Sequence, residues 1–206
     1  MNYLREDLKV IYNLNYIILL KMFKGMIMLN TQEQSKIRAE AVSYFEKAGI
    51  YLTDEEKRNK IQIVDFGTED FYEIGLVILT FINTPRYCGR FILFFPGQCV
   101  AEHWHPDIND KQGKEETFRV IWGKAYAYRE GKPTENIMAK IPKGREKYFI
   151  SRNEIVLNPG DQYTIKLGEK HWWQAGSEGV VALEVSSQAR DEFDLNTDKT
   201  LHTQML

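Results

Sequence analysis

The spacing of apolar residues changes once along the chain, near residue 60. Before this point apolar side chains recur every three or four positions, as on one face of an α-helix; they are Ile37, Ala41, Tyr44, Phe45 and Ala48. Thr31 and Gln34 fit a capping box at the start of this pattern, and Gly49 follows its end. We therefore expect an amphipathic helix over residues 32–48.

A second, shorter helix is predicted by the segment TDEEKRN, residues 53–59. Thr53 and Glu56 repeat the capping signature. The acidic residues of this segment precede the basic ones, which is the order that the helix dipole favours. Two helices are thus expected before the first strand.

From residue 61 onward, short runs rich in Val, Ile, Phe, Tyr and Thr alternate with turn residues. We expect about ten strands: IQIVDF, EIGLVILTFI, RFILFF, QCVAEHWH, ETFRVIW, KAYAY, EIVL, DQYTI, KHWWQA and VVALEVSS. Breaks are predicted at Gly123, Gly168 and Gly176 and at the turn over residues 158–161. No long helical pattern separates the runs, so parallel βαβ units are excluded. The chain is predicted to be mainly β, an antiparallel barrel or sandwich with N-terminal helices in one domain over residues 31–206.

Residues 1–30 are predicted to form an N-terminal extension. The run NYIILLKMFKGMIMLN is apolar, but Asn and Lys interrupt it before the roughly 20 apolar residues that a membrane span needs. Glu6 and Asp7 do not fit the basic start of a signal peptide. No membrane segment is therefore expected. Met26 and Met28 lie directly before the first helix, so we expect the natural chain to begin there and residues 1–27 to come from an upstream start codon.

Composition narrows the class of protein. The 206 residues are 43% hydrophobic and 27% charged, as in a globular domain with one core. The formal charge is −2 and basic residues are interspersed with acidic ones, so no binding of nucleic acid is expected. Two cysteines, Cys88 and Cys99, in a chain of this length indicate a reduced, cytoplasmic protein.

The segment EHWH places His103 and His105, two of only four histidines, at alternate positions of a predicted strand. Alternation turns both imidazoles to one face together with Cys99 and Ala101, and turns Trp104 to the other face. Two buried imidazoles side by side are costly unless something binds their lone pairs, and a transition metal is the usual answer. The pair therefore predicts a metal site.

Two further residues are candidates for the same site. Glu116 begins the next predicted strand, and His171 opens the run KHWWQA. Hairpin-connected strands can bring three imidazole nitrogens and one carboxylate oxygen to the barrel interior. Such a set leaves coordination positions open, as a catalytic site does. His202, near the C-terminus, is expected at the surface.

The order and spacing of these residues resemble the two motifs of the cupin superfamily. The matching positions are His103, His105, Glu116 and Gly123, followed by Pro159, Gly160 and His171. Longer phrases resemble one sugar-isomerase branch of that superfamily, the D-lyxose ketol-isomerases, over about residues 35–200; they are YFEKAGIYLTDEE, NTPRYCGRFILFFPGQ, EHWHP, GKEETFR, PGDQYTI, KHWWQAGSEG and LEVSS. The resemblance implies a cupin-type antiparallel β-barrel (jelly roll) that holds a divalent metal on three His and one Glu.

The sequence departs from the general cupin pattern in two places. Ten residues, 106–115, separate His105 from Glu116, where the pattern has three or four, and the stretch from Gly160 to His171 is also long. The first insertion makes Glu115 a competitor for the carboxylate ligand. The spacing to Gly123 favours Glu116.

The resemblance implies a metal-dependent aldose–ketose isomerase that interconverts D-lyxose and D-xylulose through a cis-enediol. D-Mannose and D-fructose are expected as a further pair. The partner is then a small sugar, and the expected metal is Mn²⁺, with Co²⁺, Fe²⁺ or Zn²⁺ as alternatives. Two other interpretations stay open: a cupin dioxygenase that uses the same metal site, and a cupin that binds a sugar without catalysis.

An isomerase of this kind needs a base that is not a metal ligand. In the run VVALEVSS, Glu184 shares one face of the predicted strand with Ala182 and Ser186, and it is our candidate for this base. Lys114 lies two residues before Glu116, as a lysine does in these isomerases, and is expected to stabilise the enediolate charge.

Three further residues are candidates for binding the sugar. Trp173 shares a face with His171 and is expected to form an apolar wall. Asp191 and Asp194 are expected to bind the far hydroxyl groups or to belong to a polar loop.

Two exposed positions bear on assembly. Arg119 falls on the strand face opposite Glu116 and is expected to be a structural or interface residue. Outward-facing aromatic residues such as Trp104 favour a homodimer.

Overall fold

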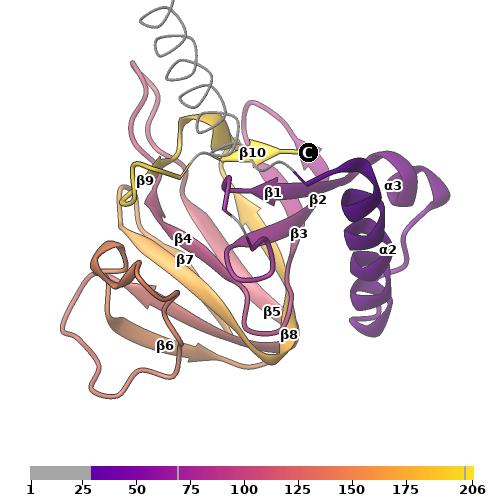
Figure 1. Ribbon diagram of the computed structural model, residues 1–206. Coiled ribbons are helices and arrows are strands. Elements are labelled where there is room, and N and C mark those ends of the chain that lie inside the picture. The colour runs from indigo at the N-terminus through magenta and orange to yellow at the C-terminus, as the bar shows by residue number, and fades with distance from the viewer. Residues whose placement is uncertain (1–28, 69, 202) are drawn as a thin grey trace, which may run out of the picture.

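The computed structural model describes residues 29–68, 70–201 and 203–206 (Figure 1). The helices are α2 (Thr31–Lys47) and α3 (Asp54–Asn59), with two 3-10 turns, η1 (Glu146–Tyr148) and η2 (Asp191–Phe193). The strands are β1 (Ile61–Asp65), β2 (Gly75–Asn83), β3 (Cys88–Phe94), β4 (Cys99–Trp104), β5 (Glu116–Arg129), β6 (Asn153–Leu157), β7 (Gln162–Ile165), β8 (His171–Ser186), β9 (Leu195–Asn196) and β10 (Gln204–Met205). Residues 1–28 and His202, on which two of the predictions fall, lie outside the described residues.

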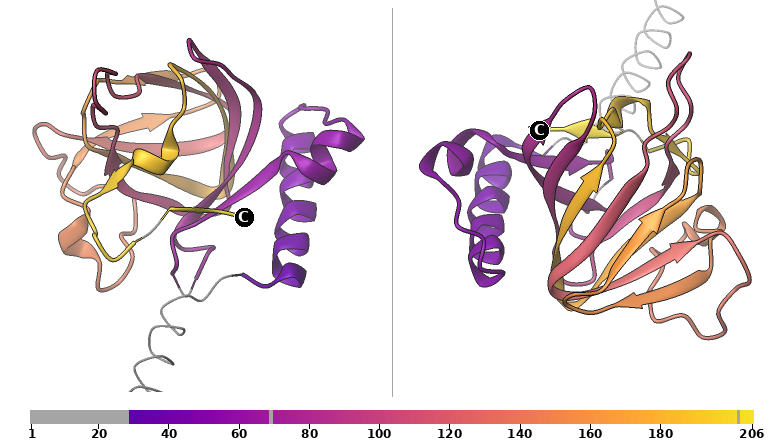
Figure 2. Two further views of the ribbon diagram at one scale, coloured as in Figure 1. Left: turned by 90° about the horizontal axis from the view of Figure 1, so that it is seen from above. Right: turned by 180° about the vertical axis from the view of Figure 1, so that it is seen from behind.

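The strands form one curled sheet. Its main path runs β10-β1-β2-β3-β8-β4-β9, and β5 pairs with β6, β7 and β8. The pairings between these strands are antiparallel. Figure 2 (left) looks into the resulting barrel, with both helices outside it. The predicted mainly β, antiparallel barrel with N-terminal helices is confirmed.

Strand β8 organises the barrel because it is long enough to serve three neighbours. Its first part, from His171, pairs with β4, and its last part, to Ser186, pairs with β3. Strand β5 pairs with it from Arg129 opposite His171 to Glu116 opposite Ser186. Residues from β3, β4 and β5 can therefore meet β8 on one inner face.

The sequence predicted breaks where β5 and β8 are continuous. Gly123 lies inside β5 and Gly176 inside β8. Gly123 has φ 80°, and the β5–β8 register shifts on both sides of it. A Cβ atom at Gly123 would lie 2.1 Å from the carbonyl oxygen of Gly179. This glycine marks a β-bulge with close backbone approach rather than the end of a strand.

Helix α2 has a different cap from the predicted one. The side chain of Asn30 accepts hydrogen bonds from the backbone N–H groups of Gln32 and Glu33, and the Glu33 carboxylate accepts one from the Asn30 N–H. The predicted box of Thr31 and Gln34 is therefore wrong by one position, and Asn30 is the N-cap of the helix. The box predicted for α3, Thr53 with Glu56, is confirmed.

Side-chain alternation divides the apolar residues between two cores. On the outer face of the sheet, Val77, Leu93 and Val181 pack against the buried face of α2, which includes Phe45. Their neighbours along the strands point to the barrel interior and form the larger core with residues such as Ile92. Each fully buried side chain of this size contributes roughly 1.5–3 kcal/mol. The helix thus stabilises the barrel wall from outside.

Two simpler findings complete the fold. Cys88 and Cys99 are buried free thiols. Within the described residues, no helix has the length and apolar character needed to cross a membrane.

Candidate metal centre and catalytic site

The structure brings the four predicted metal ligands together inside the barrel. One potential ligand atom from each of His103, His105, Glu116 and His171 lies within 4.8 Å of all the others. His103 on β4 lies directly opposite His171 on β8, with ring centroids 4.3 Å apart. His105 follows the end of β4, and Glu116 begins β5.

A bulge in β4 changes which residues accompany the histidines. Val100 pairs with Trp173 and His103 pairs with His171, so β4 has one residue more than β8 between these two pairs. Val100, His103, Trp173 and His171 all line one cavity. Cys99 pairs with Gln174, the neighbour of Trp173 on the opposite face. The prediction that Cys99 shares the face of His103 is therefore wrong.

Each histidine is held through its Nδ1 atom. Nδ1 of His103 lies 2.8 Å from the carbonyl oxygen of Ala101, and Nδ1 of His171 lies 2.9 Å from that of Glu169. Nδ1 of His105 lies 2.6 Å from the Asp194 carboxylate. Such outer partners orient metal-binding imidazoles and leave Nε2 for the ion.

The Nε2 atoms fit a shared cation. Those of His105 and His171 each lie 3.2 Å from the same carboxylate oxygen of Glu116. Both are buried, and neither has a hydrogen-bond partner among the described residues. Three imidazole nitrogens and one carboxylate oxygen are a donor set that divalent transition metals accept. The residues therefore fit a divalent metal site.

Burial and neighbouring charges set the protonation of these ligands. Burial, together with His171 and His105, holds the pKa of His103 well below its ordinary value, so its ring is neutral. Burial would raise the pKa of Glu116, but Lys114 and His105 outweigh it and hold that pKa well below the usual range. Burial and Lys114 oppose a charge on His105, yet Glu116 and Asp194 raise its pKa to about 9. A metal that binds at neutral pH therefore replaces a proton on His105.

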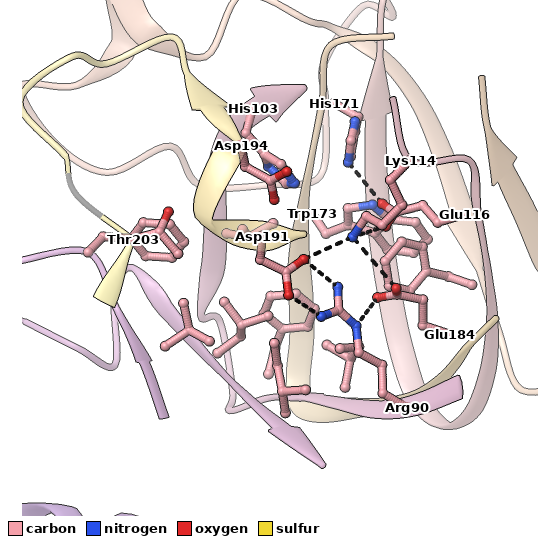
Figure 3. A pocket seen from close by; sticks show the side chains of 18 of the residues that line it. Arg90, His103, Lys114, Glu116, His171, Trp173, Glu184, Asp191, Asp194 and Thr203 are labelled. Atoms are coloured by element: carbon pink, nitrogen blue, oxygen red, sulfur yellow. Dashed lines mark hydrogen bonds and ion pairs between the residues drawn. The ribbon is translucent and has the colours of Figure 1, made fainter. Parts of the chain in front are cut away.

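Lys114 connects the ligands to a second group of charges (Figure 3). Its ammonium nitrogen lies 2.6 Å from Glu116, 3.3 Å from Asp191 and 3.6 Å from Glu184. Burial and Arg90 would lower the pKa of Lys114, but the three carboxylates outweigh them and raise it. The ammonium group therefore keeps its positive charge inside the barrel.

Glu184 lies on β8, within this charged group, and its side chain is fully buried. One carboxylate oxygen accepts a hydrogen bond from Arg90 Nε at 2.8 Å, and the other accepts one from the Ser186 hydroxyl at 3.1 Å. Both predicted catalytic side chains, Glu184 and Lys114, thus line the same cavity as His103, Glu116 and His171.

Arg90 is a charged residue of this site that the sequence analysis missed. It lies on β3, is 5% exposed, and its guanidinium contacts Asp191 at 2.5 Å as well as Glu184. Burial would lower the pKa of Arg90, but Glu184 and Asp191 raise it, so it stays charged. The signal was present in the run RFILFF, where alternation places Arg90 on the same face as the apolar Ile92 and Phe94.

The three predicted sugar-binding residues also line the cavity. Trp173 is buried, with its ring centroid 4.7 Å from that of Phe118. Asp191 contacts Arg90 and Lys114, and these cations outweigh burial and lower its pKa. Asp194 holds His105.

Other candidates lie away from the cavity. Glu115 is exposed whereas Glu116 is buried, so Glu116 is the carboxylate that reaches the histidines. Arg119 is exposed and donates a hydrogen bond to Gln162. The partly buried ring of Trp104 lies under the ammonium groups of Lys170 and Lys199.

Sequence comparison relates the chain to sugar isomerases. Residues 54–204 match the family model described as D-lyxose isomerase. The D-lyxose/D-mannose isomerase of Thermosediminibacter oceani is 46% identical over 171 residues, which cover 83% of this chain and 94% of that protein. The D-lyxose ketol-isomerase of Cohnella laeviribosi is 46% identical over 166 residues, 81% of this chain and 91% of the relative.

Structural comparison supports the fold independently. The L-ribose isomerase of Cellulomonas parahominis superposes with a TM-score of 0.69 at 17% identity, covering 85% of this chain and 95% of that one. The L-ribose isomerase of Acinetobacter sp. DL28, in complex with L-ribose, gives a TM-score of 0.66 at 16% identity, with coverage of 80% and 84%. At this identity the likeness shows a shared cupin-type fold.

Proposed function

The chain belongs to the D-lyxose isomerase family, and we propose from this that it is a metal-dependent aldose–ketose isomerase that interconverts D-lyxose and D-xylulose. The observation that carries the proposal is the match to this family over most of the chain. The His-His-Glu-His group supports it, because a carbonyl shift between adjacent carbons needs an electrophile at the oxygens. The name of the T. oceani relative supports D-mannose as a further substrate.

His103, His105, Glu116 and His171 would hold a divalent metal, for which we propose Mn²⁺. When bound, such an ion supplies a Lewis acid that polarises the sugar carbonyl. The mixed nitrogen and oxygen donors support Mn²⁺, and also suit Co²⁺, Fe²⁺ or Zn²⁺.

We propose that Glu184 moves the proton. Its carboxylate takes a proton from C2 of the aldose, which gives the cis-enediol, and returns the proton to C1, while a hydroxyl proton passes from O2 to O1. Glu184 is supported in this role because it is buried, borders the metal ligands through Lys114, and is not itself in the ligand group.

The charged side chains beside Glu184 are proposed to act in the same reaction. Lys114 keeps its proton and stabilises the negative charge that develops on the enediol oxygens. Arg90 holds the Glu184 carboxylate from the other side and fixes its direction. Trp173, Asp191 and Asp194 line the cavity and are proposed to contact the sugar.

Purified protein, stripped with a chelator and reloaded with Mn²⁺, tests the function directly. Incubation with D-lyxose should yield D-xylulose, measured as ketose formation. Absence of ketose with Mn²⁺, Co²⁺, Fe²⁺ and Zn²⁺, in folded and metal-loaded protein, contradicts the proposal. Sugar-dependent uptake of O₂ would indicate a dioxygenase, and sugar binding without turnover would indicate a binding protein.

We also propose that the enzyme is a cytoplasmic homodimer. The buried free thiols of Cys88 and Cys99 support a reducing compartment. Two half-exposed apolar side chains, Phe81 on β2 and Val185 on β8, support a subunit contact on the outer face of the barrel. They are neighbours, because Gly89 pairs with Val185 and lies under the Phe81 ring.

A further inference from the structure

Two residues that line the cavity each have a buried polar atom without a hydrogen-bond partner among the described residues, and neither residue is a predicted metal ligand. These atoms are the indole Nε1 of Trp173 and the amide oxygen Oδ1 of Asn196. Both side chains are more than nine-tenths buried, with 3% and 8% exposure. Buried polar groups are nearly always paired, so an unpaired donor and an unpaired acceptor in one cavity indicate a missing partner.

The strand register places both groups beside the metal ligands. Asn196 on β9 lies directly opposite His103 on β4, and His103 lies opposite His171 on β8. Directly opposite residues project to the same face of a sheet. Trp173 is two residues from His171, so it projects to that face as well. All four line the cavity that contains Glu184, and Figure 3 shows Trp173 among the charged side chains.

The two atoms suit a polyol. An indole N–H can only donate a hydrogen bond, and an amide oxygen can only accept one, whereas a sugar hydroxyl does both. A metal ion would satisfy Asn196 but not Trp173, and an apolar ligand would satisfy neither. The oxygens on C1 and C2 of the aldose take part in the reaction, so the hydroxyl groups at C3, C4 and C5 remain for recognition.

We propose that Trp173 and Asn196 bind hydroxyl groups of the sugar beyond the reacting carbons and thereby select the substrate. The Trp173 N–H donates to one of these oxygens, and Asn196 Oδ1 accepts from another. This role adds to the apolar wall expected of the Trp173 ring, and it rests on the proposed function. A site built to pair a hydroxyl group discriminates against an analogue that lacks it, because its own buried polar group is left without a partner.

The test combines two variants with three deoxy sugars. Trp173→Phe removes the N–H and keeps an aromatic ring, and Asn196→Leu removes the amide and keeps a branched but larger side chain. On D-lyxose each variant should lose roughly 10-fold or more in kcat/KM, mainly through KM. The loss should shrink towards 1-fold on the 3-, 4- or 5-deoxy analogue that lacks the hydroxyl bound by that residue, because the interaction is already absent.

Matched controls separate recognition from folding. Trp122→Phe changes an indole packed against Tyr44 in the outer core, and Asn59→Leu changes an exposed amide at the end of α3. Neither should alter kcat/KM by more than about 2-fold. Manganese content and the melting temperature are measured for every variant. Asn196→Ala replaces Asn196→Leu if the larger side chain prevents folding. The kcat/KM of the unaltered enzyme on each deoxy sugar is also measured, because this comparison needs no variant.

The outcomes separate this inference from the proposed function. Equal losses of kcat/KM on all four sugars, or no loss on D-lyxose, overturn the inference. Turnover of D-lyxose by the unaltered enzyme still upholds the isomerase in that case. If the unaltered enzyme turns over no aldose, binding of the same four sugars to manganese-loaded protein is measured by calorimetry instead. The same pattern in binding upholds the contacts of Trp173 and Asn196 with the sugar and overturns the isomerase, and absence of sugar binding overturns both.

Discussion

Glu184 has the environment of a base that works out of contact with water. Its carboxylate is fully buried between Arg90 and Lys114, so its direction is fixed before a sugar arrives. Glu184→Gln keeps the shape and removes the proton acceptor. We expect kcat to fall about 10²- to 10⁴-fold with unchanged manganese content, measured by ketose formation and metal analysis.

Glu115→Gln is the matched control, because Glu115 is exposed and one residue from a ligand. It should leave kcat unchanged. Retention of full activity by Glu184→Gln would show that another group carries the proton.

In the proposed mechanism, Arg90 acts on the reaction through Glu184 and is therefore a positioning residue. Arg90→Lys keeps the charge but cannot reproduce the three contacts to Glu184 and Asp191. We expect kcat to fall roughly 10- to 100-fold with KM within about 3-fold, since the carboxylate is misdirected while the sugar still binds. Steady-state kinetics measure both constants, and exposed Arg119→Lys is the control. A change confined to KM would instead place Arg90 in sugar binding.

The sequence predicted the histidine cluster but not Arg90, and the reason is physical. His103 and His105 lie in one short segment, where residue type and strand alternation already indicate a shared face. Arg90 meets Glu184 and Asp191 across separations of 94 and 101 residues, which only the fold brings together. A charged residue on an apolar face was the available clue, and it indicated burial without naming a partner.

Strands β5 and β8 depend on a glycine at their closest approach. Gly123→Ala adds a methyl group at 2.1 Å from the Gly179 carbonyl oxygen, in a backbone conformation with φ 80°. We expect a loss of about 3 kcal/mol or more in the free energy of unfolding, from steric clash and strain together. The melting temperature should fall by about 10 °C in thermal denaturation.

Gly168→Ala separates the two causes. Gly168 has φ 68° but no neighbouring atom within 4 Å of an added Cβ, so this variant carries the strain without the clash. It should cost about 1–2 kcal/mol. Equal effects of the two variants would contradict the role assigned to the contact with Gly179.

The same glycines explain why element boundaries were harder to predict than element types. Apolar alternation correctly indicated strands on both sides of Gly123 and Gly176. A glycine in a strand pattern signals either a turn or a bulge, and only pairing with a partner strand decides which. Strands β9 and β10 have two residues each and carry no detectable alternation. The local pattern therefore predicts that a strand exists more reliably than it predicts where the strand ends.

At the scale of the whole molecule, the proposed homodimer can be tested by mutations on the outer face of the barrel. Phe81 is 50% exposed beside Val185, so a charge introduced there would be desolvated in a subunit contact. We expect Phe81→Lys to shift the protein from dimer to monomer in light scattering or analytical ultracentrifugation. Tyr51→Lys, at a residue 91% exposed on the loop before α3, should not. A dimer unaffected by Phe81→Lys would place the contact on another face.

The barrel interior is completed by the last part of the chain. Residues after β8 supply Asp191 to the buried cations, Asp194 to His105, and Asn196 opposite His103. Ribosomes synthesise chains from the N-terminus, so all four proposed metal ligands emerge before these three side chains. A barrel wall can therefore form during translation while its site is still open to the solvent. The proposed metal donors are thus complete before the carboxylate that holds His105 and the amide that lies opposite His103 are added.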